Sequence, residues 1–595
     1  MEFRTLYCGD VRVQHVGQEI TLAGWLHRRR DHGGLVFIDL RDSRGIVQVV
    51  INPTEPDLDL DTVQEFRNEW LIQVTGTVSE RPEGTVNMNL PTGQTEVLAS
   101  SVNVINPSNT PPFNVNDSSN VDESLRMKYR YLDLRRPNLQ ENLWLRHRVV
   151  KHIRDFLDDK GFIEIETPIL IKSTPEGARD YLVPSRVHRG QFYALPQSPQ
   201  QLKQLLMVSG FDKYFQIARC FRDEDLRADR QPEFTQLDLE MSFVTERDVL
   251  NLTEDLYLDI MAKLAPEFSV TNPMPRIKYQ DAMDRYGTDK PDIRFALELK
   301  NLSAEVQDFD FAVFKDTLAA GGCVKAISAP GCSSYSRKQM AGLTEFAVSR
   351  GASGLITIAV DEDGEQSGNS YRSVLSKYLS DAEMHLIAKA TDASPGDLIL
   401  IVAGKPKIVN AVLGDLRLEL RDRLNLVDQD TLAFCFITDF PLFDWNEEKQ
   451  RWDSSHHPFT SPTEEDEQYL DTDPGRVISK AYDLVCNGSE LASGSIRIHR
   501  RALQEKVLAI LGYTSSEMVE RFNQLLEAFD YGAPPHGGIA PGIDRFIALL
   551  SRNATSIRDV IAFPKTQAAT DPLFGSPDEV STEQLRDLGL RIVPE

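Results

Sequence analysis

The residues best suited to chemistry lie in residues 221–238, FRDEDLRADRQPEFTQLD, where three arginines stand among several carboxylates. An arginine can bind two phosphate oxygens at once, and a neighbouring carboxylate can hold its side chain in one rotamer. Arg222, with Glu224 beside it, is therefore suited to the α-phosphate of a nucleotide. Charge alone favours a solvated surface turn by about two to one, so charge alone does not establish a nucleotide site.

Two apolar stretches flank the charged one and predict a β-hairpin. Residues 214–221 (YFQIARCF) run apolar, and residues 234–244 (FTQLDLEMSFV) alternate with period two, as strands do. We expect the hairpin to present Arg222, Glu224, Arg227 and Arg230 together at one end.

Length and charge limit the class of protein. A chain of 595 residues with 41% hydrophobic and 26% charged residues is long enough for about three or four globular domains. Its net charge of −25 argues against indiscriminate binding of nucleic acid, which needs clustered Lys and Arg. Any contact with RNA must use local basic patches, such as HRRR at residues 27–30.

Hydropathy and cysteine spacing argue against a membrane or secreted protein. No run of 18 apolar residues occurs, and the start of the chain, MEFRTLYCGD, lacks the apolar core of a signal peptide. The six cysteines form no CxxC pair, which predicts neither a zinc site nor a disulfide framework. We therefore expect a cytoplasmic protein with reduced cysteines and no membrane contact.

Residues 1–105 predict a small β-domain. Short strand patterns (ITLAGWL, LVFIDLRD, GIVQVVI and WLIQVTGTVSE) surround a helical stretch at residues 61–70, an order that fits an OB-fold barrel. Such barrels bind single-stranded nucleic acid by stacking bases on aromatic side chains beside a cationic groove. Phe37 follows the arginine cluster, and Gln48 on the next strand has an amide able to read a base edge. By composition alone, Phe37 has about even odds of being a core residue.

The residues between this domain and the charged hairpin contain a linker and two predicted helices. Residues 106–137 are rich in Pro, Asn and Ser and then basic, which indicates a linker. A helix is expected over residues 138–160, before the strand FIEIETPIL. QSPQQLK predicts a second helix from about Ser198, with Gln200 and Lys203 near its first turn. Taken alone, Lys203 favours a surface lysine by about three to one.

Residues 287–424 differ in character from their neighbours. Strand and helix signals alternate there with many glycines, and no catalytic constellation occurs. The pattern predicts a self-contained α+β domain inserted into the chain.

Two stretches after the insertion carry groups suited to an anionic substrate. HHPFT at residues 456–460 has two adjacent histidines, but the further ligands that a metal site would need nearby are missing. Asp483, Glu490 and Arg497 recur every seven residues, and carboxylate oxygens are what Mg²⁺ prefers. This spacing need not put the three on one face of a hairpin.

The stretch GGIAPGIDRFIALL at residues 537–550 begins glycine-rich and continues into a predicted helix that starts near Arg545. Small residues let the backbone approach an adenine ring, and the Arg545 guanidinium can stack on that ring or bind the γ-phosphate.

Together these motifs resemble the class II aminoacyl-tRNA synthetases. FRDE with EFTQLD is similar to motif 2 of that class, GFIEIETPIL to motif 1 and GGIAPGIDRFIALL to motif 3, and the three occur in the right order. QSPQQLK, HHPFT and the insertion resemble the bacterial-type aspartyl enzymes of the class. The resemblance implies a homodimer formed through the helix and strand of motif 1.

The resemblance also implies roles for individual residues. The catalytic residues would be Arg222, Glu224 and Arg545. L-Aspartate would be bound by Glu176, Ser198, Gln200, Lys203, Arg222, Asp238, His456 and Arg497. ATP would be bound by Arg222, Asp223, Glu224, Gln231, Phe234, Glu490, Gly542, Ile543, Asp544 and Arg545. Asp483 and Glu490 would hold Mg²⁺ at the ATP phosphates, zinc would be absent, and the tRNA anticodon would be gripped by Arg30, Phe37 and Gln48.

The implied reaction is activation of L-aspartate with ATP and transfer of the aspartyl group to tRNA(Asp). His32 and Gly84 stand where strictly aspartate-specific bacterial enzymes tend to carry leucine and lysine. This resembles the non-discriminating type, which also charges tRNA(Asn), and a strictly tRNA(Asp)-specific enzyme is the alternative. More remote alternatives are an ATP-dependent asparagine synthetase on the same fold and an inactive RNA-binding paralogue.

The expected fold is multidomain α+β. Its parts are an OB-fold anticodon-binding barrel (1–105), a linker (106–137), the first part of a class II antiparallel-sheet catalytic domain with motifs 1 and 2 (138–286), an α+β insertion (287–424), the second part of the catalytic domain with motif 3 (425–555) and a C-terminal extension (556–595).

Overall fold

The computed structural model describes residues 3–54, 60–116, 121–174, 177–224, 230–361 and 370–593. The chain divides into two compact units, Met1–Gln140 with Asp571–Ser576, and Glu141–Thr570 with Pro577–Glu595.

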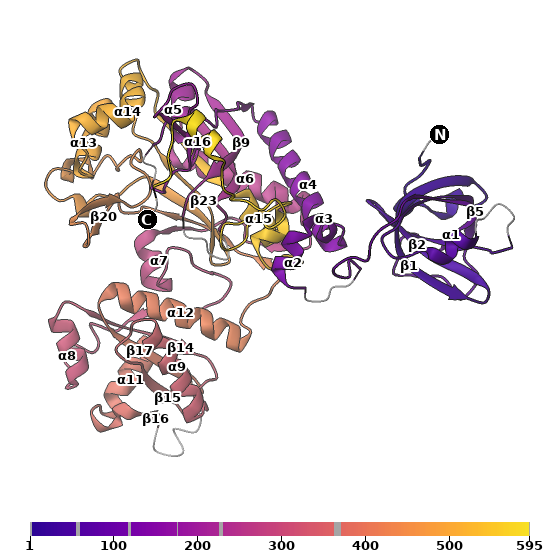
Figure 1. Ribbon diagram of the computed structural model, residues 1–595. Coiled ribbons are helices and arrows are strands. Elements are labelled where there is room, and N and C mark those ends of the chain that lie inside the picture. The colour runs from indigo at the N-terminus through magenta and orange to yellow at the C-terminus, as the bar shows by residue number, and fades with distance from the viewer. Residues whose placement is uncertain are drawn as a thin grey trace. The chain divides into compact units, whose positions relative to one another are not determined.

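Five strands of the first unit form a closed barrel in the order β1-β2-β3-β5-β4 (Figure 1). They are β1 (Glu19–His32), β2 (Leu35–Asp42), β3 (Gly45–Ile51), β4 (Leu71–Glu80) and β5 (Thr95–Asn106), with the helix α1 (Leu60–Glu65) between β3 and β4. Because strand side chains alternate between faces, Ile38 and Leu40 of β2 point into the barrel core, whereas Phe37 does not belong to it. The expected OB-fold is confirmed, and its helix is shorter than the sequence predicts.

The second half of the predicted linker is folded. It contains the short helices α2 (Glu123–Lys128) and α3 (Arg130–Asp133). The buried carboxylate of Asp133 forms ion pairs with Arg126, Arg130 and Arg136, at 3.1, 2.6 and 3.2 Å. One buried acid therefore organises this basic stretch, which composition alone presents as irregular chain.

An eight-stranded sheet forms the frame of the second unit, in the order β12-β19-β22-β23-β24-β10-β9-β6. The strands from β19 to β9 pair antiparallel, and β12 and β6 add parallel strands at the two edges. In chain order these are β6 (Ile163–Glu164), β9 (Lys213–Phe221), β10 (Glu233–Ser242), β12 (Arg276–Lys278), β19 (Phe434–Thr438), β22 (Ala481–Cys486), β23 (Ser489–Ile496) and β24 (His536–Pro541). The predicted antiparallel catalytic sheet is confirmed.

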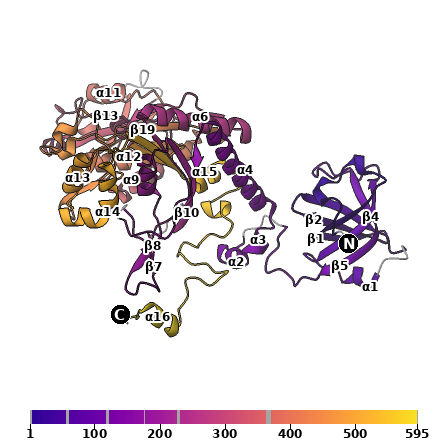
Figure 2. The ribbon, with the colours of Figure 1, turned by 90° about the horizontal axis from the view of Figure 1, so that it is seen from above.

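Three helices cover one face of this sheet: α4 (Pro137–Asp159), α6 (Glu246–Leu264) and α15 (Ile543–Leu550) (Figure 2). The core beneath them contains Ile153 of α4, Tyr257 of α6 and Phe546 of α15, packed on sheet residues such as Leu239. With this face sealed by apolar side chains, polar residues at alternate strand positions are left on the other face.

The strand that follows α4 is much shorter than the sequence predicts. Only Ile163 and Glu164 of the motif 1 stretch pair with β9. The later residues of that stretch run on without ladder partners, and Ile169 and Leu170 are exposed. Local β-propensity is satisfied here only where a neighbouring strand edge is within reach.

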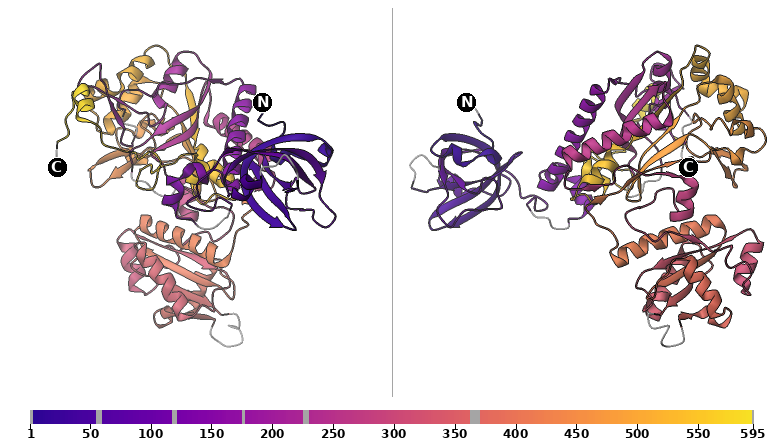
Figure 3. Two further views of the ribbon diagram at one scale, coloured as in Figure 1. Left: turned by 45° about the vertical axis from the view of Figure 1, so that its right-hand side comes forward. Right: turned by 180° about the vertical axis from the view of Figure 1, so that it is seen from behind.

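The insertion has its own five-stranded sheet, in the order β13-β14-β17-β15-β16 (Figure 3). Its strands are β13 (Lys300–Asn301), β14 (Cys323–Ala329), β15 (Ile356–Val360), β16 (Tyr371–Ser373) and β17 (Leu398–Gly404), and its helices are α8 (Ala312–Ala319), α9 (Arg337–Ser349), α11 (Asp381–Ala390) and α12 (Pro406–Leu424). Along β17, Leu398 and Leu400 belong to one core, and Ile399 and Ile401 belong to the other. A sheet buried on both faces is the α+β unit that the sequence predicts.

The other helices and strands are shorter or peripheral. They are α5 (Gln200–Val208), α7 (Tyr279–Tyr286), α13 (Arg501–Ile510), α14 (Ser515–Phe529), α16 (Thr582–Leu588), β7 (Leu182–Pro184), β8 (Phe192–Ala194), β11 (Ser269–Val270), β18 (Thr431–Leu432), β20 (Phe443–Asn446) and β21 (Arg451–Ser454).

Strand β24 approaches β10 so closely at Gly538 that no side chain fits there. A Cβ at Gly538 would lie 2.0 Å from Leu239 O and 2.2 Å from Glu240 Oε2. We expect Gly538→Ala to lower the free energy of unfolding by about 1–3 kcal/mol, because the sheet must distort to accept the methyl group. In α9, an added Cβ at Gly342 meets no heavy atom within 4 Å, so Gly342→Ala should stabilise by about 0.5–1 kcal/mol. Urea unfolding followed by circular dichroism measures both, and equal midpoints for the two variants would refute the packing argument.

Candidate active site

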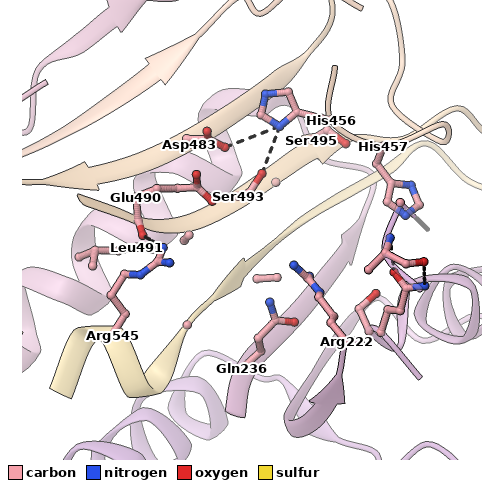
Figure 4. Close-up of a pocket in the computed structure, with 18 of the residues that line it drawn as sticks. Arg222, Gln236, His456, His457, Asp483, Glu490, Leu491, Ser493, Ser495 and Arg545 are labelled. Carbon is pink, nitrogen blue, oxygen red and sulfur yellow. Dashed lines mark hydrogen bonds and ion pairs between the residues drawn. The ribbon is translucent and has the colours of Figure 1, made fainter. Parts of the chain in front are cut away.

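A cavity of about 790 Å³ opens on the polar face of the eight-stranded sheet. Residues from the β9–β10 hairpin, β22, β23 and the start of α15 line it, and Figure 4 shows several of them. Of the predicted site residues in this unit, those that line it are Ser198, Gln200, Arg222, Glu224, Gln231, Phe234, Asp238, His456, Asp483, Glu490, Arg497, Gly542, Asp544 and Arg545.

The hairpin places Arg222 in the cavity. β9 ends at Phe221, which pairs with Glu233 at the start of β10, so the antiparallel hairpin is as the sequence predicts. The Arg222 guanidinium lies 5.1 Å from the centroid of the Phe234 ring. It points into the cavity beside Gln236 (Figure 4). Stacking on the ring orients the guanidinium without using its hydrogen-bond donors.

The end of the hairpin is only partly described. Glu224 accepts a hydrogen bond of 2.9 Å from Arg230 Nη1, which holds that carboxylate at the cavity wall. The expected sites Glu176 and Arg227 lie outside the described residues.

Alternation along β10 carries a row of polar residues to the cavity side. Leu237 and Leu239 lie in the core under the helices, so Gln236, Asp238 and Glu240 face the other way. Our reading of the sequence names Asp238 and misses Gln236 and Glu240. The period-two pattern in FTQLDLE was the signal that could have found them.

A buried ionic network joins β10 to two cations. Lys203 Nζ lies 2.7 Å from Asp238 Oδ1 and 3.2 Å from Glu240 Oε2. Arg497 donates from Nε to Glu240 Oε1 at 3.0 Å and from Nη2 to Glu240 Oε2 at 3.2 Å. The Lys203 side chain is only 1% exposed, so the surface interpretation of this lysine is wrong. Both cations of the predicted clamp thus contact one carboxylate.

The network shifts the acidities of its two carboxyl groups in opposite directions. Burial alone would raise the pKa of Glu240, but the charges of Arg497 and Lys203 lower it to about 2. Burial dominates at Asp238 and raises its pKa, although Lys203 opposes the rise. No well-aligned hydrogen bond from a described residue reaches either Asp238 oxygen, which leaves this carboxylate suited to an ammonium group from the cavity.

A hydrogen-bonded chain orients Gln200 at the cavity wall. Gln200 Nε2 donates to Gln204 Oε1 at 3.2 Å, and Gln204 Nε2 lies 3.1 Å from His536 Nε2. His536 Nδ1 lies 2.7 Å from Pro534 O. A carbonyl only accepts, so Nδ1 must carry the proton and Nε2 must accept from Gln204. The Gln200 carbonyl is thereby left to accept from a ligand.

The two histidines of HHPFT reach different ends of the cavity. His456 Nδ1 lies 3.3 Å from Ser493 Oγ and 3.8 Å from Asp483 Oδ1, whereas His457 lies apart from them (Figure 4). Burial, followed by the charges of Arg497 and its neighbouring cations, lowers the pKa of His457 well below its usual range. The sequence places His456 at the aspartate clamp, but in the structure His457 is the histidine beside those cations. These adjacent side chains reach different parts of the cavity, which residue types alone do not reveal.

Asp483 and Glu490 form an acidic end of the cavity. Asp483 is buried, its Oδ1 accepts no hydrogen bond from a described residue, and burial with the charge of Glu490 raises its pKa well above the usual range. Glu490 Oε2 lies 2.8 Å from Lys290 Nζ, and its backbone carbonyl accepts from Arg545. A cation would relieve the repulsion between the two acids, so these residues fit a metal ion.

The number of ligands indicates what kind of metal site this is. Among the described residues, no group of three or more His, Cys, Asp or Glu side chains is arranged to hold a metal ion. Two carboxylates completed by phosphate oxygens and water are the usual environment of Mg²⁺ at a nucleotide. The geometry therefore suits a metal that arrives with phosphate.

Three predicted nucleotide residues have other surroundings. Ile543 is buried in the core under the helices and does not line the cavity. Asp223 does not line the cavity either, and its backbone pairs with Arg179. Asp544 accepts hydrogen bonds from Thr235 N, at 2.8 Å, and from Arg146, so its carboxylate ties α15 to β10 and α4. Asp544 lines the cavity with its carboxylate already engaged, whereas Asp223 and Ile543 each follow a motif residue that does line the cavity. Position within a motif therefore does not fix side-chain direction.

Gln231 lines the cavity with its amide already engaged. Its Nε2 donates to Lys565 O at 3.0 Å, and its Oε1 accepts from Lys565 N at 2.8 Å.

The barrel brings its three predicted anticodon residues together on the outer face of neighbouring strands. Arg30 pairs with Phe37 in the β1–β2 ladder, and Arg30 Nη2 donates to Asp39 at 2.6 Å and to Gln48 Oε1 at 3.2 Å. Gln48 Nε2 also donates to Glu96. Phe37 is half-buried outside the core, so the core interpretation of this residue is wrong.

His32 and Gly84 lie in exposed parts of the barrel unit. His32 is the last residue of β1 and is exposed. Gly84 has φ of +83°, a left-handed conformation that strains any other residue. Local backbone geometry is thus a second reason for glycine at this position.

Comparison with known families decides the class. Residues 122–567 match the family described as tRNA synthetases class II (D, K and N), and residues 20–105 match the OB-fold nucleic acid binding domain. The chain belongs to the class II tRNA synthetases. This synthetase is 57% identical over 586 residues, 98% of both chains, to a Dehalococcoides mccartyi protein named Aspartate--tRNA(Asp/Asn) ligase. It is 51% identical over 594 residues, 100% of both chains, to a Staphylococcus haemolyticus protein named Aspartate--tRNA ligase.

The fold of the synthetase agrees with solved structures. The asparaginyl-tRNA synthetase from Pyrococcus horikoshii, crystallised with asparaginyl-adenylate, superposes with a TM-score of 0.58 at 18% identity, covering 94% of this chain and 98% of that one. None of the helices in the described ranges is long and apolar enough to cross a membrane.

The pairing of Glu240 predicts a pH-dependent contribution to the stability of the synthetase. Glu240→Gln leaves two buried cations without their shared anion, so we expect the free energy of unfolding at pH 7 to fall by about 3–5 kcal/mol. Because the pKa of Glu240 is lowered from 4.5 to about 2, its contribution is fully present above pH 4.5 and is lost as the pH falls toward 2. Urea unfolding at several pH values should show the free energies of unfolding of wild type and variant converging as the pH falls from 4.5 toward 2.

An exposed pair provides the control. Glu467 contacts Arg500 at the surface, and Glu467→Gln should change the free energy of unfolding by less than about 1 kcal/mol. If Glu240→Gln lowered the free energy of unfolding by the same amount from pH 7 to pH 2.5, the stabilising role of the ionised Glu240 carboxylate would be contradicted.

Proposed function

We propose that this synthetase activates L-aspartate with ATP to form aspartyl-adenylate, and then transfers the aspartyl group to both tRNA(Asp) and tRNA(Asn). The observation that carries the proposal is the buried pair of cations, Lys203 and Arg497, held on one carboxylate beside the cavity. The names of the relatives support the same substrate.

Charge favours aspartate over asparagine at this end of the cavity. Lys203, Arg497 and Arg222 carry three positive charges against the two carboxylates Asp238 and Glu240, so one net positive charge remains. The net charge of aspartate is −1 and neutralises it, whereas asparagine is neutral overall. Leaving a cation unpaired in a buried site costs more than losing one ordinary contact.

Hydrogen-bond donors remain for the substrate side chain. The contacts of Arg497 to Glu240, Ser495 Oγ and Gly538 O use four of the five guanidinium hydrogens, among the described residues. The remaining Nη1 hydrogen of Arg497 and the Lys203 ammonium, which makes no well-aligned hydrogen bond to a described residue, can clamp a carboxylate. Asp238 and the Gln200 carbonyl supply acceptors for the α-ammonium group, with Ser198 nearby.

The rest of the cavity suits ATP. Arg222 lies between His457, which is beside the two cations, and Glu490 (Figure 4). From there it can bridge the aspartate α-carboxylate and the α-phosphate. Phe234 offers a ring face, Glu224 an acceptor for an adenine amine, and Arg545 a guanidinium for adenine or the γ-phosphate. The α-carboxylate attacks the α-phosphorus and pyrophosphate leaves. A hydroxyl at the tRNA 3′ end then attacks the carbonyl carbon of the mixed anhydride, and AMP leaves as the ester forms. Positioning and charge neutralisation lower the first barrier, so no side-chain base is required.

Asp483 and Glu490 would hold Mg²⁺ at the phosphates. When bound, this ion would neutralise charge on the phosphate oxygens and favour departure of pyrophosphate. The structure keeps both carboxylates on the antiparallel pair β22 and β23, at the end of the cavity away from the aspartate clamp.

The barrel provides a surface for the anticodon. Phe37 offers a partly exposed ring beside the Arg30 guanidinium and the Gln48 amide, a combination suited to a stacked base with a readable edge. His32 and Gly84 would permit both tRNA(Asp) and tRNA(Asn).

The assembly is proposed to be a cytoplasmic homodimer. Trp144 of α4, Ile163 of β6, Ile169 and Leu170 are exposed apolar side chains in the motif 1 region, and β6 is the edge of the eight-stranded sheet. Both features suit association with a second copy.

Side-by-side charging tests the reaction and its tRNA range. Purified synthetase with ATP, Mg²⁺ and labelled aspartate should charge tRNA(Asp) and tRNA(Asn) at comparable rates, because the barrel lacks the leucine and lysine side chains of strict enzymes at positions 32 and 84. Charging of tRNA(Asp) alone would establish the strictly specific alternative. Charging of neither would refute the proposal.

The amino-acid clamp is tested by Lys203→Met, which keeps the side-chain length and removes the charge. Aspartate-dependent exchange of pyrophosphate into ATP should fall by at least about a hundredfold, as expected when a buried charge pair to substrate is lost. ATP binding, measured by calorimetry, should stay within about threefold because the acidic end of the cavity is untouched. The melting temperature controls for unfolding, and exchange at the wild-type rate would exclude Lys203 from the clamp.

A further inference from the structure

The connection from α7 into the insertion forms one wall of the nucleotide end of the cavity. Asp289 and Lys290 of this connection line the cavity together with Asp483 and Glu490. Lys290 Nζ lies 2.8 Å from Glu490 Oε2, and the Lys290 side chain is 42% exposed. A lysine from outside the three class motifs therefore contacts a carboxylate of the proposed metal site.

The insertion anchors this connection through its last helix, α12. Arg417 is buried and donates to the backbone carbonyls of Asp292, at 2.8 Å, and of Phe295, at 2.8 Å. Its guanidinium also lies 3.8 Å from the centroid of the Phe295 ring. These contacts pin the chain two residues beyond Lys290.

A second arginine of α12 binds the same connection through a side chain. Arg421 Nη1 donates to Asp292 Oδ2 at 3.1 Å, and Arg294 contacts the same carboxylate at 2.8 Å. On the other side, an added Cβ at Gly488 would lie 3.7 Å from Asp292 Cβ, so the connection packs directly on the β22–β23 turn. The insertion thus fixes the backbone from which Lys290 reaches Glu490.

The contact has a consequence for nucleotide binding. The Lys290 ammonium occupies the position beside Glu490 that a divalent cation needs. A metal ion at Glu490 would repel that ammonium, while the triphosphate that accompanies the metal offers new anionic oxygens within reach of a flexible four-carbon stem.

We propose that Lys290 is a further residue of the nucleotide site, positioned by the insertion, and that it exchanges partners during binding. Its ammonium holds Glu490 in the free enzyme and transfers to a β- or γ-phosphate oxygen when ATP and its divalent cation take over Glu490. The inference rests on the proposed use of ATP at this end of the cavity. It assigns the insertion a task in amino-acid activation.

The proposal predicts effects of opposite sign for two ligands of the full-length enzyme. In Lys290→Met, Mn²⁺ alone, followed by electron paramagnetic resonance, should bind the free enzyme several-fold more tightly because its competitor at Glu490 is gone. ATP with Mg²⁺, and pyrophosphate with Mg²⁺, should bind about tenfold more weakly by calorimetry because one charged contact is lost. Lys290→Arg should keep ATP binding close to wild type. If the Lys290–Glu490 ion pair were purely structural, its loss in Lys290→Met would weaken the binding of both ligands together.

Variants of the insertion test the positioning. Arg421→Gln should weaken ATP binding about threefold, with little further effect in a Lys290→Met background, because both act through the same side chain. Lys300→Met removes an insertion lysine whose ion pair within the described part of the chain is with Asp392 at the surface. It should change the binding of neither ligand. Unchanged ATP and pyrophosphate binding in Lys290→Met would overturn the proposal. Neither measurement needs aspartate or tRNA, so the result stands apart from whether the wild type charges tRNA with aspartate.

Discussion

The structure of the catalytic unit depends on the carboxylate of Glu240, which lies between two buried cations. A buried charge without a partner costs several kcal/mol, so Lys203 from α5 and Arg497 from the end of β23 must both meet β10 at one place. Gly538 makes room for that carboxylate on the neighbouring strand. The Glu240 carboxylate thus holds α5, β10 and the end of β23 together. The two cations that it binds outnumber it, which would suit an anionic substrate side chain.

The cavity has a cationic end and an acidic end, and the separation explains how one pocket can serve two substrates. In the proposed reaction, Lys203 and Arg497 would attract a carboxylate, whereas Asp483 and Glu490 would attract a metal ion with phosphate. Arg222 lies between His457, which is beside these cations, and Glu490 (Figure 4). This is where the α-carboxylate and the α-phosphate would meet in the proposed reaction. Close approach of two anions needs a cation at that position, and Phe234 holds it in place.

Much of the fold and part of the site could be predicted from the sequence. Alternation in residues 214–221 and 234–244 located the hairpin, and short strands in residues 1–105 located the barrel, because side-chain periodicity follows directly from strand geometry. The same method overestimated the motif 1 strand, of which only Ile163 and Glu164 pair. A strand needs a partner edge, and the position of that edge is not a local property.

By itself, the sequence determined the class of the protein, the order of its motifs and a part of the residues that line the cavity. Those depend on residue types at short spacing. Only the tertiary structure decided which histidine meets the cations, that Glu240 is their common partner, and that Lys290 of the connection to the insertion reaches Glu490. These contacts join residues distant in the chain, and a long-range ion pair depends on how the sheet, helices and insertion pack rather than on any local pattern.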